Sequence, residues 1–580
     1  MGHRPYAWER GYPPSLDWGA PIEVRTLPAL LDSAVARHGD RPAIEFEGQV
    51  LTYRELRQRI DAAATTLLRM GTGRGTAVAV YLPNTVFHPI AFFAILRVGG
   101  RVVHLSPLDS PRMLRYKLLD SGARTLVTLG ARPMLDQAIA LRAAGLLDHL
   151  LIADAGENSG FAATPCPEGV PLLQEPGSLL EPDPGPEDPD EIALLQYTGG
   201  TTGQPKGAIL THANLSAAVG SYRAWFQAIG EAIGPSDRIL CVLPLFHIYA
   251  LTTILLLGLD RGAEILLRSR FDPTRSLDDI ERRRATVFPG VPTMWISLAR
   301  DPAIATRDLS SLRVLSSGGA PLPAEVAATI ERLTGRRLTG GWGMTETGPA
   351  GTRLPPGRAH APGLIGLPLP GVELRIVALD DPRRVLDPGE IGELCVRGPN
   401  VSPGYWRRPE ETAAAFIDGF LLTGDVGCMD ADGTFRLVDR KHDMIISGGF
   451  NVYPSMVEQA IYEHPAVDEV LVIGVPDDYR GEAAKAYVKL RDGHDRFTLE
   501  QLRAFLADRL GRHELPAALE FRAALPRTPV GKLWRRGLID ELARETAARE
   551  SGDQGAAVNT SAPNTLTPGA PAKPSGESPK

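Results

Sequence analysis

Short apolar runs alternate with longer amphipathic stretches through most of the first 440 residues, and this alternation limits the possible folds more than any other feature. Runs such as "TAVAVYL" (76–82), "TLVTL" (125–129) and "RILCVL" (238–243) have the length of buried strands, whereas "TYRELRQRIDAAATTLLRM" (52–70) has the pattern of a helix. Strands and helices that alternate in this way form largely parallel sheets with helices packed on their faces. We therefore expect an α/β fold whose large N-terminal domain contains parallel-rich sheets packed with helices.

A glycine-rich segment, "YTGGTTGQPKG" at 197–207, directly follows one of these expected strands. Glycine lets backbone N–H groups approach a ligand closely, and the threonine hydroxyls and Lys206 add further donors. This composition indicates an anion site, and a polyphosphate suits it best. It is not a P-loop, because Gly207 rather than Ser or Thr follows Lys206. An ordinary surface turn is the alternative interpretation.

The chain has 580 residues, more than a single core usually supports, so we expect at least two domains. Past residue 440 the pattern changes to a smaller α+β unit, with strands at "EVLVIGV", "AAKAYVKL" and "ALEFRAAL" and helices at "LEQLRAFLADRL" and "KLWRRGLIDELARE". The predicted domains are a large domain over 1–439, a small mobile α+β domain over 440–548 and a tail over 549–580. The tail has almost no large apolar residue and is predicted to be disordered.

Charge and cysteine content narrow the functional class. The net charge of −7 and a pI near 6.0 argue against nucleic acid as a partner. Four widely spaced cysteines without a CxxC pair suggest a reducing compartment and no metal site among them. The first residues lack the apolar segment of a secretory signal. We expect a cytoplasmic protein, and homodimers are common by base rate.

One apolar stretch, "LCVLPLFHIYALTTILLLGL" at 240–259, is long enough to cross a bilayer. Pro244, His247 and Tyr249 interrupt its first half, and charged residues close both ends. A buried strand, a turn and a core helix explain the stretch better than a membrane span. At most we expect peripheral contact with a membrane.

Further dense motifs follow one another along the chain. They are "SSGGAPLP" (316–323), "GWGMTETG" (341–348), "GELCVRGPNVSPGYW" (392–406), "TGD" (423–425), "DRKHDMIISGGFNVYP" (439–454) and "LPRTPVGK" (525–532). Together with the glycine-rich segment, this series closely resembles the signature motifs of the adenylate-forming superfamily, which includes acyl-CoA synthetases, peptide synthetase adenylation domains and luciferases. The resemblance covers about residues 25–545. The glycine at 199, where most members have serine, resembles bacterial long-chain fatty acyl-CoA synthetases.

The resemblance implies a two-step reaction. A carboxylate attacks the α-phosphate of ATP to give an acyl-adenylate and pyrophosphate, and a thiol, usually that of coenzyme A, then displaces AMP. Two anionic partners must meet, so the site needs magnesium, lysine and oriented backbone donors.

The resemblance also assigns nucleotide contacts. The loop on the β- and γ-phosphates would consist of Thr198, Gly199, Gly200, Thr201, Thr202, Gly203 and Lys206. Gly318, Ala320 and Pro321 would line the adenine pocket, with Trp342 stacked on the base. Asp425 would accept the ribose hydroxyls, and Arg440 would help on the ribose or phosphate side. For Trp342 the alternative is core packing, and for the "TGD" motif it is an ordinary turn.

Four residues would act in the chemistry. Thr345 would contact the α-phosphate, Glu346 would hold magnesium, and Lys532 would bridge the substrate carboxylate and the α-phosphate. His247 would lie beside the carboxylate. Helix capping by Thr345 and Glu346 and a hydrogen-bonded core position for His247 are the alternatives.

The small domain is expected to rotate between an adenylating and a thioester-forming pose. The second pose would bring Ser447, Gly448 and Gly449 to the thiol, and the hinge falls at His442. Because histidine can change its charge near neutral pH, protonation of His442 could tune this rotation.

The carboxylic substrate is restricted by the segment around His247. No acidic residue lies within 239–259, so the α-ammonium of an amino acid would be buried without a partner. Apolar neighbours such as Phe246, Leu251 and Ile254 suit an alkyl or aryl tail. We favour a medium-to-long-chain fatty acid; a dicarboxylic or aryl acid, or loading of a carrier protein from an acyl-AMP, remains open. A non-catalytic relic is disfavoured, because Lys206, Glu346, Asp425, Arg440 and Lys532 are all present.

Overall fold

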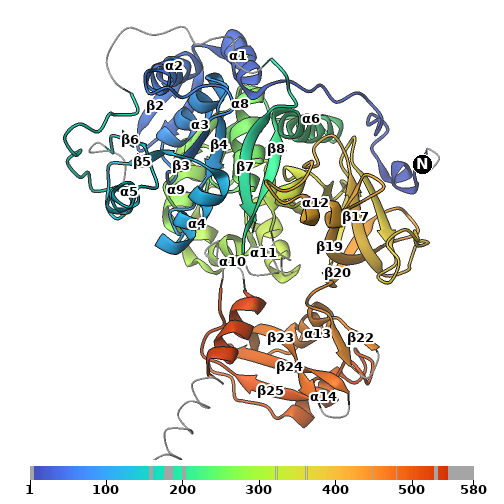
Figure 1. The fold of residues 1–580 in the computed structure, drawn as a ribbon. Helices are drawn as coiled ribbons and strands as arrows, with labels where there is room; N and C mark the ends of the chain where they lie inside the picture. Colours follow the sequence, from blue (N-terminus) through green and yellow to red (C-terminus); the bar gives the residue numbers. More distant parts are fainter. Residues whose placement is uncertain are drawn as a thin grey trace, which may run out of the picture. The chain divides into compact units, whose positions relative to one another are not determined.

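The protein was analysed as a computed structural model, which describes residues 5–155, 161–174, 187–198, 204–319, 322, 324–358, 361, 363–447, 450–477, 480–527 and 533–545 (Figure 1). Contacts divide the chain into two compact units. The first comprises Met1–Met444 with Asn451–Gln459, and the second comprises Ile445–Phe450 with Ala460–Lys580. The predicted tail at 549–580 lies outside the described residues.

One sheet of the first unit has the strand order β6-β5-β3-β4-β7-β8. Its strands are β3 (Ala77–Tyr81), β4 (Arg101–His104), β5 (Thr125–Leu129), β6 (His149–Ala153), β7 (Ile192–Thr198) and β8 (Lys206–Thr211). All neighbours are parallel except β7 and β8, which form an antiparallel pair around the glycine-rich loop. The associated helices are α3 (Phe87–Arg97), α4 (Pro111–Ser121), α5 (Met134–Ala143) and α6 (His212–Ala228).

A second sheet has the order β13-β12-β11-β9-β10-β1-β2. Its strands are β1 (Pro42–Phe46), β2 (Gln49–Thr52), β9 (Arg238–Cys241), β10 (Glu264–Leu267), β11 (Val287–Gly290), β12 (Val314–Ser317) and β13 (Leu338–Gly340). Only β1 and β2 pair antiparallel. The helices here are α1 (Leu27–His38), α2 (Tyr53–Arg69), α9 (Pro273–Arg283), α10 (Pro292–Arg300) and α11 (Ala324–Thr334). The expected parallel-rich α/β architecture is therefore confirmed.

A third, antiparallel sheet completes the first unit. It contains β14 (Thr352–Arg353), β15 (Leu364–Pro368), β16 (Glu373–Val377), β17 (Gly392–Arg397), β18 (Phe416–Ile417), β19 (Phe420–Met429) and β20 (Phe435–Arg440). The helix α12 (Pro409–Ala415) and three short 3-10 turns, η1 (Ala7–Gly11), η3 (Pro302–Thr306) and η4 (Thr345–Thr347), also belong to this unit. Asp425 and Arg440 face each other across β19 and β20 in this sheet.

The second unit is built on β21 (Ile445–Ser447), β23 (Val467–Asp477), β24 (Gly481–Leu490) and β25 (Ala518–Phe521), with α14 (Leu499–Leu506) and a helical stretch at 535–545. The strand β22 (Phe450–Val452) pairs with β21, and α13 (Pro454–Tyr462) follows it. The core of the second unit includes Leu471, Ile473, Tyr487, Leu525 and Leu538. The elements predicted past residue 440 are present.

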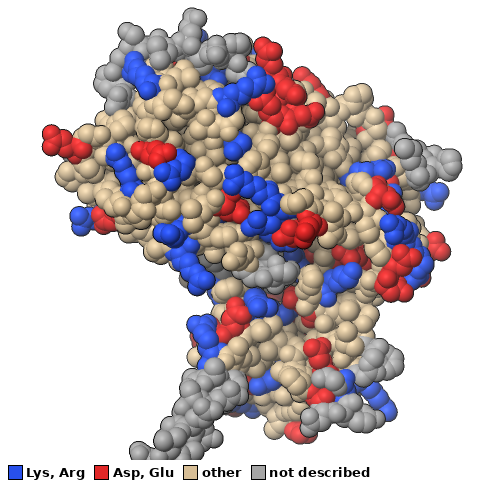
Figure 2. Space-filling model, in the orientation of Figure 1, with Lys and Arg blue, Asp and Glu red and all other residues tan. Residues whose placement is uncertain are grey.

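The apolar stretch at 240–259 begins in β9, turns, and continues through α7 (Ile248–Ala250), the π-helix η2 (Leu251–Leu256) and α8 (Leu257–Arg261). Its leucines and isoleucines are buried in the core of the first unit. Throughout the described residues, every helix is too short or too polar to cross a bilayer. On the face drawn in Figure 2, basic and acidic side chains are interspersed, which agrees with the nearly balanced charge.

Candidate active site

The glycine-rich segment sits between two paired strands. Thr198, at the end of β7, lies opposite Lys206, at the start of β8, and the loop that joins them lies outside the described residues. The predicted phosphate contacts in that loop are Gly199, Gly200, Thr201, Thr202 and Gly203. Beyond the loop, the Tyr116 hydroxyl donates to the Pro205 carbonyl at 2.9 Å and so holds the start of β8. β8 also packs against α6 (Figure 1) and against η4, which contains Thr345.

Tyr405 joins Lys206 to Glu346. The Tyr405 hydroxyl donates to Glu346 Oε1 at 2.9 Å, and the Lys206 Nζ lies 5.3 Å from the centre of the Tyr405 ring. The backbone around Tyr405 runs beside β8, because the Ile209 N–H donates to the Gly404 carbonyl at 3.0 Å and the Trp406 N–H to the Gly207 carbonyl at 2.8 Å. The structure thus brings the predicted phosphate lysine to the ring of Tyr405 and the predicted metal-binding carboxylate to its hydroxyl.

Glu346 is a buried carboxylate, with 6 % of its surface exposed. Burial raises the pKa of Glu346, while the hydrogen bond from Tyr405 and the charge of Arg440 act in the opposite direction. A magnesium ion that takes most of its ligands from phosphates and water needs only one or two protein carboxylates. Among the described residues, no group of three or more His, Cys, Asp or Glu side chains is placed so that it could hold a metal ion. The single carboxylate of Glu346 has the donor chemistry that a phosphate-bound magnesium ion needs from the protein.

Asp425 is held by two predicted nucleotide-binding residues. The Trp342 Nε1 donates to Asp425 Oδ2 at 2.7 Å, and the Arg440 Nε lies 2.8 Å from Asp425 Oδ1. Burial raises the pKa of Asp425, and both Arg440 and the Trp342 hydrogen bond counteract this shift. A carboxylate has about four acceptor positions, so ribose hydroxyls can still be bound. Trp342 is buried as the packing alternative requires, and stacking on adenine stays a prediction.

Gly318 and His247 lie on either side of Tyr249. A side chain at Gly318 would meet the Tyr249 ring at 3.0 Å, and the Tyr249 hydroxyl lies 3.3 Å from the Ser316 hydroxyl on β12. His247 precedes α7, and its Nδ1 accepts the Tyr249 N–H at 3.3 Å. The predicted adenine-pocket glycine and the predicted carboxylate-side histidine are therefore linked by one aromatic residue.

Several predicted residues cannot be placed. Ala320, Pro321, Gly448, Gly449 and Lys532 lie outside the described residues. Ser447 belongs to the second unit, where it is buried opposite Gly481. Their assigned roles stay predictions, as do those of Thr345 and Arg440 toward the nucleotide.

Two site residues were missed by sequence reasoning. Tyr405 lies in the motif "GELCVRGPNVSPGYW", which was identified without a role for its tyrosine, and Tyr249 lies in the apolar stretch at 240–259. Each tyrosine contacts two predicted site residues that are far apart in the sequence. The tyrosine in the "PGYW" part of the motif was the available signal for Tyr405.

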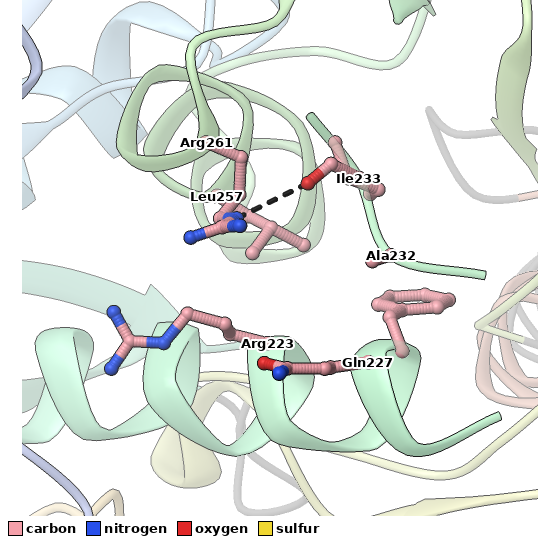
Figure 3. A pocket seen from close by; sticks show the side chains of 7 residues that line it. Arg223, Gln227, Ala232, Ile233, Leu257 and Arg261 are labelled. Carbon is pink, nitrogen blue, oxygen red and sulfur yellow. Dashed lines mark hydrogen bonds between the residues drawn. The ribbon is translucent and has the colours of Figure 1, made fainter. Parts of the chain in front are cut away.

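A separate small hollow lies between α6 and α8 (Figure 3). Arg223 and Gln227 from α6 and Leu257 and Arg261 from α8 line it, and the Arg261 Nε donates to the Ile233 carbonyl at 3.1 Å. No predicted site residue lines this hollow, so we do not assign it to the active site.

Comparison with known families decides the classification. The model for "AMP-binding enzyme" matches residues 31–406, and that for "AMP-binding enzyme C-terminal domain" matches residues 456–532. The chain belongs to the AMP-binding enzyme family. Its similarity to curated members extends over nearly the whole of their length, so this AMP-binding enzyme has both parts of the family architecture.

Among curated relatives, a long-chain-fatty-acid–CoA ligase of Bacillus subtilis (strain 168) is 37% identical over 558 residues, covering 92% of this chain and 98% of the relative. A feruloyl-CoA synthase of an Amycolatopsis species is 38% identical over 495 residues, covering 85% of this chain and 94% of the relative. Among solved structures, ATP-bound MatB from Rhodopseudomonas palustris is 30% identical with a TM-score of 0.77, covering 90% of this chain and 99% of that one. The anthranilate CoA ligase AuaEII in complex with anthranoyl-AMP is 25% identical with a TM-score of 0.79, covering 91% and 99%.

Proposed function

We propose that this AMP-binding enzyme converts a medium-to-long-chain fatty acid to its CoA thioester through an acyl-adenylate, releasing AMP and pyrophosphate. The observation that carries the reaction type is the contact of Lys206 and Glu346 with one tyrosine, next to the glycine-rich loop. The similarity to the bacterial long-chain ligase supports the substrate class.

Separate groups of residues would bind the phosphates and the ribose of ATP. Lys206 and the backbone donors of the loop neutralise the β- and γ-phosphates, so that pyrophosphate can leave. Asp425, fixed by Trp342 and Arg440, holds the ribose and orients the α-phosphate toward the incoming carboxylate. Glu346 is the residue that would hold magnesium, which supplies charge neutralisation on the phosphates.

The acid is bound beside His247. The segment that follows His247 is apolar and buried, and each methylene of an alkyl chain would contribute about 0.8 kcal/mol to binding there. Lys532 would bridge the substrate carboxylate and the α-phosphate during adenylation, and Ser447, Gly448 and Gly449 would then lie near the thiol of CoA. Rotation about His442 would separate the two half-reactions. The four cysteines are free, which supports a cytoplasmic location for the reaction.

An aryl acid is the second candidate. It is favoured by the feruloyl-CoA synthase relative and by the structural similarity to the anthranilate CoA ligase. Tyr249 against Gly318 could pack on an aromatic ring as well as on an alkyl chain.

A panel of carboxylic acids tests the proposal. Release of AMP and pyrophosphate is measured with ATP and CoA for straight-chain acids of increasing length, α,ω-dicarboxylic acids, benzoates and hydroxycinnamates. The proposal predicts a maximum at one alkyl length that is lost in Lys532→Ala. A preference for the aryl acids would replace the substrate assignment, and pyrophosphate release without dependence on CoA would indicate carrier loading.

A further inference from the structure

Four buried polar groups form a continuous line of contacts from His88 on α3, through His104 on β4, to the segment before His247. His88 Nε2 lies 3.3 Å from His104 Nε2, and His104 Nδ1 lies 2.9 Å from Gln196 Oε1. The Gln196 Nε2 then donates to the Phe246 carbonyl at 3.0 Å. His88, His104 and Gln196 are 0 %, 2 % and 7 % exposed, so water competes little for these contacts.

The Phe246 carbonyl fixes the direction of this line. A carbonyl oxygen only accepts, so Gln196 must present its NH2 group to Phe246 and its oxygen to His104. His104 must then carry a hydrogen on Nδ1 and donate to Gln196. The other end of the line is a second acceptor, the Leu82 carbonyl, 3.3 Å from His88 Nδ1.

The two histidines are neutral at pH 7. Burial lowers the pKa of His104 to about 4. The hydrogen bond to Gln196 raises this pKa, and the positive charge of Lys117 lowers it further. Burial also holds the pKa of His88 well below its usual value. Each neutral histidine ring carries one N–H, and one N–H of the Gln196 amide points to Phe246. Three hydrogens therefore serve the four contacts from the Leu82 carbonyl to the Phe246 carbonyl. The two longest contacts, both 3.3 Å, involve His88. One of these two contacts therefore has no hydrogen, and both hydrogen bonds of Gln196 are formed.

The line connects two parts of the candidate site. Gln196 stands two residues before Thr198 on the strand that enters the phosphate loop, and Phe246 directly precedes His247. The same segment is held from its other side by the buried Asn84, whose amide donates to the Leu243 carbonyl at 2.9 Å and accepts the Leu245 N–H at 2.8 Å. Asn84 thus fixes the segment up to Leu245, and Gln196 fixes its last residue before His247.

We propose that Gln196 is a positioning residue that fixes His247 relative to β7, and that the His88–His104 pair holds the Gln196 amide in the required orientation. The inference rests on the proposed function, because it assigns the carboxylate of the acid to the His247 side. Neither histidine contacts a substrate in this account. Their effect on the reaction passes through Gln196.

Gln196→Met tests the positioning role, because methionine has nearly the same length and cannot donate to Phe246. With hexadecanoate, ATP and CoA, we expect kcat/KM for the acid to fall at least tenfold while the KM for ATP changes less than twofold. Gln137→Met is the control, since Gln137, on α5, accepts a hydrogen bond from the Tyr81 hydroxyl on β3 at 3.0 Å and is not among the predicted site residues. Equal kinetics in both methionine variants would overturn the inference.

Two substitutions of His104 separate hydrogen bonding from packing. Asparagine can place an N–H near the position of the imidazole Nδ1, whereas leucine fills more of the space and has no donor. We expect His104→Asn to keep kcat/KM for the acid within threefold of the parent enzyme and His104→Leu to lose as much as Gln196→Met. If His104→Asn is impaired as strongly as His104→Leu, the histidine acts by packing alone.

A spectroscopic measurement keeps this inference distinct from the proposed function. In protein labelled with ¹⁵N-histidine, His104, assigned from the spectrum of His104→Asn, should appear as the Nδ1–H tautomer between pH 6 and 8. Gln196→Met should abolish that preference. A parent enzyme inactive on every fatty acid but with this tautomer would refute the fatty-acid assignment alone. An active parent with an Nε2–H tautomer would refute the orientation of Gln196.

Discussion

The indole nitrogen of Trp342 donates a hydrogen bond to Asp425 across 83 residues of sequence, at 2.7 Å. Arg440 binds the other oxygen of the same carboxylate. The residue predicted to stack on adenine therefore also fixes the residue predicted to bind ribose. This one bond would couple the two predicted contacts, with adenine and with ribose.

Trp342→Phe should weaken ATP binding about tenfold. A hydrogen bond to a charged group contributes roughly 1.5–3 kcal/mol, and its loss raises the pKa of the buried Asp425 carboxyl. Equilibrium binding of ATP and of 2′,3′-dideoxy-ATP distinguishes the two roles of the tryptophan, because only ATP has ribose hydroxyls for Asp425. Trp225→Phe is the control, since its buried indole N–H has no hydrogen-bond partner among the described residues. Equal losses for both nucleotides would assign the effect to stacking alone.

Tyr405→Phe should shift the acidic limb of the pH–rate profile to higher pH. The Tyr405 hydroxyl stabilises the ionised form of Glu346, whose pKa burial already raises, so removing the hydroxyl requires a higher pH for the same ionisation. Profiles of kcat/KM for ATP at fixed magnesium measure the shift. Tyr53→Phe removes a buried hydroxyl that donates to the Ala263 carbonyl at 2.8 Å, and its profile should match the parent enzyme. A Tyr405→Phe limb that coincides with the parent limb would show that Glu346 does not need this donor.

His212→Asn should make the fold less sensitive to acid. The buried His212 Nδ1 accepts the Leu27 N–H at 3.2 Å, and burial lowers the pKa of His212 from 6.5 to about 4. The unfolded chain takes up this proton near pH 6.5 and the folded chain does so only near pH 4. The stability contributed by neutral His212 is therefore present above pH 6.5 and is lost as the pH falls toward 4, by up to ~3 kcal/mol. Asparagine can accept the same N–H without titrating, so Tm should fall less between pH 7.5 and 5 in the variant; an equal fall would contradict this.

Arg268→Met should destabilise the first unit by about 3–5 kcal/mol, because it removes the ion-pair partner of the buried Asp279 and leaves the buried Glu45 with only its longer contact to Arg283, at 3.5 Å. Arg268 contacts Asp279 at 2.5 and 2.7 Å and Glu45 at 2.8 Å, and all three side chains are buried. Urea denaturation followed by tryptophan fluorescence measures the loss. Arg124→Met, which breaks an exposed pair with Asp148, should have little effect. If the variant is about as stable as the parent protein, Arg268 is not required to neutralise the carboxylates of Asp279 and Glu45.

The sequence predicted the features that depend on local pattern. The alternation of apolar runs located β3, β5 and β9, and the glycine-rich segment was expected directly after a strand, as it is after β7. The contacts of Tyr405 with Glu346 and of Gln196 with Phe246 could not be predicted, because they depend on strand register and on turns between residues 50 or more positions apart. The π-helix after His247 also has no local signature, since its residues suit an ordinary helix equally well.

The most direct test of the account follows one oxygen atom. Hexadecanoic acid labelled with ¹⁸O in both carboxyl positions is converted with ATP and CoA, and AMP and pyrophosphate are examined by mass spectrometry. Attack of the carboxylate on the α-phosphate predicts one ¹⁸O in each AMP and none in pyrophosphate, together with hexadecanoyl-CoA. Unlabelled AMP, or label in pyrophosphate, would contradict the acyl-adenylate route on which the whole assignment of the site rests.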